Sequence, residues 1–170
     1  MKNEAVLKDN GGYFFRLGTS VLLTTVGLFL AAGVIGCSGK ASTVPKALIQ
    51  EYISKHATLV DRSLVDLYVE SERDKISEMV DQSIADQTSA GNLETLQHAT
   101  FDFTNFKTEL VDEKEDYVDD SPTPFMKVSA TGSFTMTLEN GSKTIPVKDV
   151  VILEKEGADW KITESTNPWG

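Results

Sequence analysis

The chain of 170 residues has few of the residues that build metal, redox and disulfide chemistry. It contains one cysteine and two histidines, which excludes an intramolecular disulfide framework and any zinc or iron–sulfur site with several cysteines. Basic residues are also scarce, because 16 Lys and Arg stand against 26 Asp and Glu, a formal net charge of −10. Phosphate binding needs a surplus of Lys and Arg, so nucleic acid is not an expected partner. The 40% of apolar residues suffice for one globular core plus one further segment.

That further segment is an uncharged apolar run near the N-terminus. Residues 17–35 read LGTSVLLTTVGLFLAAGVI, and Lys2, Lys8 and Arg16 precede them. A basic flank, an apolar run and small residues at its end indicate an export signal. The run is also just long enough to cross a bilayer as a helix. In either case the rest of the chain is expected outside the cytoplasm.

The end of the run carries the only cysteine. Val34-Ile35-Gly36-Cys37 resembles the lipobox of bacterial lipoproteins, with Val34 where Leu is usual and Ile35 where a small residue is more frequent. The resemblance implies cleavage between Gly36 and Cys37, and a diacylglyceryl thioether with palmitate-type acylation on Cys37. Each buried methylene of such an anchor contributes about 0.8 kcal/mol. The alternative is an uncleaved signal anchor in which Cys37 is an interfacial thiol.

The lipoprotein interpretation sets the domain organisation and the location. Residues 1–36 are then a signal peptide, 37–43 a lipidated cysteine with a short tether, and 44–170 one folded domain. Cleavage leaves 13 basic and 24 acidic residues, a surface that anionic headgroups repel, so the lipid must hold the protein at the membrane. The domain is expected to face the periplasm or the cell exterior, on the cell membrane or the outer membrane. Under the same resemblance, Ser38 after the cysteine is compatible with the outer one.

Apolar residues at helical spacing predict three helical stretches in the first half of the domain. They fall within residues 44–53, 60–68 and 76–84. Thr58 with Asp61, and Ser71 with Asp74, have the spacing of capping boxes that would open the second and third stretches. The polar run 86–92, which contains Gly91, is expected to end the helical half.

The second half changes to the period of a strand. Phe101 and Phe103 alternate with polar residues, and the apolar positions then switch parity, which predicts a β-bulge near Thr104-Asn105. Residues 126–138 have an apolar residue or Gly at every even position, the pattern of a half-buried, curved strand.

Two turn signals join the strands that follow. Asn140-Gly141 predicts a type I′ hairpin leading into a strand over 145–153. Pro146 confines the start of that strand to an edge or a bulge. A second turn at Gly157 leads to a last strand with Trp160 and Ile162 inward.

Helices followed by four antiparallel strands joined by hairpins indicate an α+β fold. The pattern resembles the nuclear transport factor 2-like fold, also called ketosteroid isomerase-like or cystatin-like. In particular, VSATGSFTMTLENG and VKDVVILEKEGADWKITES are similar to the endings of small bacterial lipoproteins of unknown function with this fold. The resemblance covers roughly residues 44–166. It implies N-terminal helices packed in a strongly curved four-stranded antiparallel sheet, a cone with a pocket at its open end.

The sequence contains one candidate catalytic residue. Enzymes of the resembled fold use an acid or base inside the cone, with a tyrosine donor. Here the predicted inward positions are almost wholly apolar, and Asp102 is expected to face solvent, while Asp149 lies in a strand flanked by charges. The candidate is His98, which is expected near Tyr52 or Tyr68. The alternative is that His98 is a surface histidine or a hydrogen-bonded structural one. No nucleophile motif or phosphate-binding loop occurs, so the chain is not expected to be an enzyme.

Two further groups of residues have a functional and a structural interpretation. The acidic residues between 112 and 120 would be a weak calcium site or a solvated hairpin end, and they lack the order of a calcium-binding loop. Aromatic residues would line an apolar ligand pocket or fill the core. The predicted pocket residues are Tyr52, Tyr68, Phe101, Phe103, Phe134 and Trp160. Trp169 either packs back on the sheet or contacts a partner.

These observations favour a membrane-anchored, non-catalytic binding or accessory module of the cell envelope. No metal or cofactor is expected, and its partner would be a small apolar ligand or an envelope protein. Two alternatives stay open. One is a signal-anchored structural subunit of a secretion or lipid-import complex, which the chain resembles in plan. The other is a small-molecule enzyme that uses the cone pocket.

Overall fold

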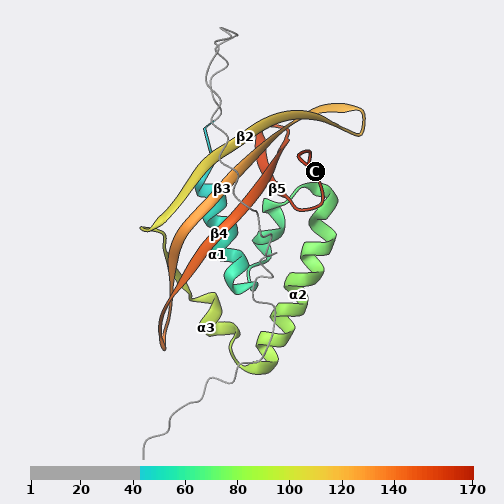
Figure 1. Cartoon of the computed structure of the whole chain (residues 1–170). Helices are drawn as coiled ribbons and strands as arrows, with labels where there is room; N and C mark the ends of the chain where they lie inside the picture. The colour runs from blue at the N-terminus through green and yellow to red at the C-terminus, as the bar shows by residue number, and fades with distance from the viewer. Residues whose placement is uncertain (1–42) are drawn as a thin grey trace, which may run out of the picture. The chain divides into compact units, whose positions relative to one another are not determined.

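A computed structural model describes residues 43–170 (Figure 1). Within this range, helical segments come first and strands follow, which confirms the α+β order. The segments are α1 (Lys46–Thr58), η1 (Arg62–Leu67), η2 (Glu70–Glu72), α2 (Arg73–Ala90), α3 (Leu93–Gln97), β1 (Thr100–Asp102), β2 (Phe106–Val118), β3 (Ser121–Leu138), β4 (Gly141–Glu156) and β5 (Asp159–Thr163). None of the helices in residues 43–170 is both long and apolar enough to cross a membrane. The predicted export segment and Cys37 lie outside the described residues.

The strands form one curled antiparallel sheet around the long central strand β3 (Figure 1). Strand β3 pairs with β4 along one edge and with both β1 and β2 along the other, and β5 pairs with the far edge of β4. Pro146 lies in the half of β4 that β5 does not reach, because β5 pairs only with Ile152–Glu156. The predicted edge position of this proline is therefore confirmed.

The sheet has five strands, where the sequence predicted four, because the expected first strand is broken into β1 and β2. The side chain of Asp102 accepts hydrogen bonds from the backbone N–H of Thr104 at 2.9 Å and from its hydroxyl at 2.6 Å. This local turn ends β1, and the chain rejoins the same edge of β3 at Phe106, opposite Gly132. The predicted bulge near Thr104-Asn105 is thus a break between strands. The register shift itself lies between Leu110 and Asp112.

The prediction for β3 is confirmed, and the one for the turn after it is wrong by one residue. Met126, Val128, Ala130 and Phe134 are all buried. Leu138 pairs with Gly141, so Glu139 and Asn140 form the two-residue turn between β3 and β4. The turn with two positive φ values, as type I′ requires, lies instead between β2 and β3, where Asp119 has φ 49° and Asp120 has φ 61°.

Neither predicted capping box forms. Leu59 adopts a left-handed conformation that ends α1, and Asp61 caps η1 by accepting from the backbone N–H of Ser63. Helix α2 begins at Arg73 without a side-chain cap and ends at Gly91, which is left-handed with φ 73°. Helix α2 ends within the run 86–92, but the prediction that this run ends the helical half is wrong, because the short helix α3 follows it.

One hydrophobic core joins the helical segments to the concave face of the sheet. The apolar positions predicted from helical spacing are its main helical members, which confirms that part of the prediction. Its buried residues are Ile49, Tyr52, Ile53, Leu64, Leu67, Tyr68, Ile76, Val80, Phe106, Met126, Val128, Ala130, Phe134, Val151, Leu153 and Ile162.

Candidate functional site

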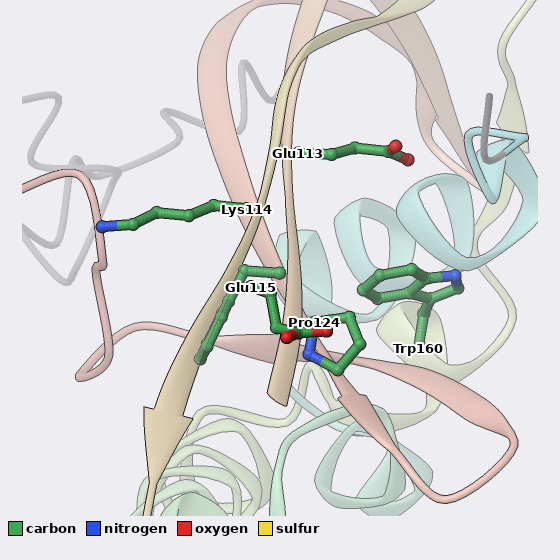
Figure 2. Close-up of a pocket in the computed structure, with 6 residues that line it drawn as sticks. Glu113, Lys114, Glu115, Pro124 and Trp160 are labelled. Carbon is green, nitrogen blue, oxygen red and sulfur yellow. The ribbon is translucent and has the colours of Figure 1, made fainter. Parts of the chain in front are cut away.

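A shallow, open hollow of about 220 Å³ lies where the β2–β3 hairpin faces β5. Figure 2 shows five of its side chains from three strands. Its lining residues are Glu113, Lys114, Glu115, Pro124, Phe125 and Trp160.

The register of the hairpin decides which side chains enter the hollow. Glu113 lies opposite Met126 and Glu115 opposite Pro124. Met126 is fully buried on the concave face, and directly opposed residues of an antiparallel pair share a face, so both glutamates project from that face. Lys114, one position between them, points to the other side, as Figure 2 shows. Alternation along β2 therefore separates the lysine from the two carboxylates.

Trp160 supplies the aromatic wall of the hollow. It lies in β5 opposite Lys155, whose ammonium group is 5.1 Å from the centre of the indole ring. The same ammonium group donates a hydrogen bond to the carbonyl oxygen of Ala158. The indole therefore already holds one cation in place by a cation–π contact.

The acidic residues of β2 differ in whether their charge is matched. Asp112 accepts a hydrogen bond from the indole of Trp169 at 2.9 Å, and Asp116 pairs with Lys114 at 3.3 Å. Within residues 43–170, the carboxylates of Glu113 and Glu115 take part in no ion pair or hydrogen bond. The hollow thus presents two unmatched carboxylates beside an indole, a set that suits an ammonium or guanidinium group.

A second polar cluster lies inside the domain, around two buried tyrosines. Tyr52 is 7% exposed and Tyr68 is fully buried, and their rings meet edge to face with centroids 6.0 Å apart. The Tyr68 hydroxyl donates to a carboxylate oxygen of Glu164 at 2.9 Å. Burial, reinforced by the negative charge of Glu164, raises the pKa of both tyrosines above the ordinary value. Both hydroxyls therefore stay protonated at neutral pH.

The histidine beside these tyrosines is His56, and not the predicted His98. The ring of His56 lies 5.4 Å from that of Tyr52, four residues earlier in α1. Burial lowers its pKa, against the opposing effect of Glu164 and Asp149, so the imidazole is neutral at pH 7. His98 is exposed at the C-terminal end of α3. Tyr52 and His56 are four residues apart, a spacing that places two side chains side by side on a helix, and this spacing could have identified the pair from the sequence.

Most of the predicted pocket residues pack in or against the core. Tyr52, Tyr68 and Phe134 are buried in it. Phe101 and Phe103 pack against Phe134, with ring centroids 6.1 and 5.4 Å away. Of the six predicted residues, only Trp160 lines the hollow.

The remaining candidates have defined places in the structure. Asp102 is exposed, as predicted. Asp149 lies opposite the buried Ala130 and shares the parity of Val151, so it projects from the concave face, a position that the sequence analysis missed. Among residues 43–170, no group of three or more His, Cys, Asp or Glu side chains is arranged to hold a metal ion.

The C-terminal segment folds back on the sheet. Besides the bond from Trp169 to Asp112, the ammonium group of Lys127 is 5.5 Å from the centre of the Trp169 ring, and Lys114 donates to the carbonyl oxygen of Pro168 at 2.6 Å. The structure thus selects the first of the two interpretations of Trp169, that it packs on its own sheet.

No protein-family model matches this chain, and no curated protein matches it significantly.

Proposed function

We propose that this chain is a lipid-anchored, extracytoplasmic binding module of the cell envelope, without catalytic activity. The observation that carries the proposal is the sequence Val34-Ile35-Gly36-Cys37 at the edge of the apolar run 17–35. A single cysteine at that position serves as an attachment point for lipid. Residues 44–170 would then form the module that the lipid holds near the membrane.

The fold is compatible with the nuclear transport factor 2-like interpretation, since an antiparallel curled sheet packs against N-terminal helices around one core. In that fold the concave face would enclose a ligand. Here the concave face is occupied by core side chains, Tyr52, Phe134 and Leu153 among them. This favours binding at the surface over binding in a deep cone.

Binding is favoured over catalysis by the state of the polar groups. Every buried side-chain nitrogen or oxygen in residues 43–170 has a hydrogen-bond partner, so these groups serve packing and orientation. The unmatched carboxylates of Glu113 and Glu115 lie instead in an open hollow, where water has access. An exposed pair of this kind can attract a cation but lacks the burial that tunes a general acid or base.

The proposal is tested by the mass of the full-length protein, extracted from membranes of its own host. We expect a chain that begins at Cys37 and carries acyl groups. A Cys37→Ser variant should carry no acyl group and keep residues 1–36, whereas the neighbouring Ser38→Ala variant should be processed like the wild type. Protease added outside the cytoplasmic membrane should digest the domain.

An acyl-free wild-type chain with an intact N-terminus would contradict the lipid anchor. It would favour the signal-anchored structural subunit, in which the run 17–35 itself spans the membrane.

A further inference from the structure

Strand β2 forms an open edge of the sheet. It pairs only with β3, and in residues 43–170 its positions from Lys107 to Val118 make no backbone hydrogen bond to any other segment. In such an edge strand every second residue directs its N–H and C=O groups away from the sheet. The N–H groups of Glu113 and Tyr117 donate to the carboxylates of Asp112 and Asp116 at 2.9 and 2.8 Å, so an added strand replaces these two local hydrogen bonds. The other edge is different, because Ile162 of β5 accepts a hydrogen bond from Val69 and forms a bridge with Tyr68.

The part of this edge that can receive a further strand is bounded at both ends. The register shift after Leu110 marks its start, and the turn at Asp119 and Asp120 marks its end. Between them, residues 112–118 keep a continuous antiparallel register with β3. A regular stretch of seven residues is as long as an average strand.

The charge of the edge selects what can pair with it. Residues 107–120 carry seven carboxylates and two lysines. A second copy of β2 would place carboxylates against carboxylates, which disfavours self-pairing. An incoming strand that carries Lys or Arg would meet the opposite charge.

The hollow adds a defined contact to this general attraction. Glu113 and Glu115 are two residues apart on one face of β2, so basic residues two apart on an added strand would lie beside them. The indole of Trp160 borders the same hollow and can contact the aliphatic stem and the charge of such a side chain.

We propose that an extended segment of a partner protein, with Lys or Arg at alternate positions, adds to β2 along residues 112–118 as a further strand. Its basic side chains then bind Glu113 and Glu115 beside Trp160. This inference rests on the proposed role as a binding module and names the chemistry of the protein partner.

The test uses the purified full-length protein in mild detergent and two synthetic nine-residue peptides. One alternates Lys and Thr, and the other has the same composition with its lysines in one block. We measure affinity by calorimetry and the hydrogen exchange of backbone amides by mass spectrometry. The alternating peptide should bind more tightly and slow exchange within residues 112–118, because only it places its lysines on one face of a strand.

Two matched double variants separate the site from the overall negative charge. Glu113→Gln with Glu115→Gln should weaken binding about tenfold, the effect of losing two ion pairs in a partly desolvated site. Glu78→Gln with Glu94→Gln removes the same charge from exposed positions of α2 and α3 and should change affinity less than about twofold.

Equal weakening by the two double variants, equal binding of the two peptides, or binding without protection of residues 112–118 would overturn the proposal. Absence of binding by both peptides would overturn it as well. None of these results bears on the mass of the acylated chain, so failure here and failure of the lipid anchor are distinguishable.

Discussion

The carboxylate of Glu72 holds the end of the sheet against the helical half. It is 4% exposed and accepts hydrogen bonds from the hydroxyls of Thr163 and Ser165 at 2.7 and 2.8 Å. The backbone N–H groups of Glu164 and Ser165 also donate to it, at 3.0 to 3.2 Å. Burial alone would raise its pKa, but these donors outweigh burial and hold the pKa below the ordinary value of 4.5.

We predict that Glu72→Gln lowers the free energy of unfolding by about 2 kcal/mol at pH 7, because the amide offers one acceptor oxygen where the carboxylate has two. A carboxylate whose folded-state pKa is depressed stabilises the protein above its unfolded pKa and stops doing so as pH falls through the folded value. The difference between wild type and variant should therefore shrink below pH 4.5. Urea unfolding at pH 7 and pH 3.5 measures this difference in the free energy of unfolding, and the exposed Glu78→Gln variant is the control. A difference that does not change with pH would contradict the role of the ionised Glu72 carboxylate.

A residue of the site could be identified from the sequence only where its signal is local. Trp160 and the acidic residues of 112–120 were both identified, because an aromatic residue in an alternating strand and a run of carboxylates are visible locally. The sequence did not show that these residues line one hollow, because this depends on the curl of the sheet that brings β2 toward β5. His98 was selected over His56 because it precedes the first strand, although burial beside Tyr52 depends on how α1 packs.

At the scale of elements, the break between β1 and β2 depends on a close approach to β3. Gly132 has φ 104°, and a Cβ atom there would lie 2.0 Å from the carbonyl oxygen of Asn105. That carbonyl accepts a hydrogen bond from the backbone N–H of Ser133 at 3.2 Å. Asn105, the last residue of the break, is therefore fixed to the central strand at a point where only glycine fits.

We predict that Gly132→Ala lowers the free energy of unfolding by about 3 kcal/mol, from backbone strain and from steric overlap with Asn105. Gly157→Ala is the matched control. Gly157 also has a positive φ, of 62°, but its Cβ would meet nothing within 4 Å, so about 1 kcal/mol is expected. Urea denaturation of both variants measures the difference. Equal losses in the free energy of unfolding would show that the close approach of Asn105 to Gly132 does not affect stability.

The elements themselves were largely predictable, and their ends were not. The alternation over 126–138 and the helical spacing over 44–53 are decided by burial on one face, so they appear in the sequence. The capping boxes at Thr58 and Ser71 failed because tertiary contacts set where those helices begin. Asp61, the fourth residue of the box predicted to begin at Thr58, caps η1 instead.

On the scale of the whole molecule, the buried tyrosines connect the helical half to the end of the sheet. Tyr68 follows η1, bridges to Ile162 of β5 and donates to Glu164 just beyond it. Tyr52 of α1 packs on its ring. Both hydroxyls are protonated in the folded state beyond the pH at which a solvated tyrosine ionises.

We therefore predict that stability falls as pH rises above 10. A group whose folded-state pKa is raised stabilises the protein fully below its unfolded pKa, and this contribution is lost as pH rises beyond it, by about 1.4 kcal/mol per tyrosine and pH unit. Urea unfolding at pH 9 and pH 11 measures the loss. The double variant Tyr52→Phe with Tyr68→Phe should lose less over this interval than the wild type, and equal losses would contradict the prediction.

The order of the elements has a consequence for synthesis. Helix α1 and the segments after it leave the ribosome first, yet Ile49, Leu64 and Ile76 belong to the same core as Val128, Leu153 and Ile162 of the strands, which are made later. Strands β3, β4 and β5, by contrast, each pair with the strand made just before them. Until the strands are made, the nascent helical half exposes apolar surface, and this stretch is therefore the one that a holding chaperone would cover.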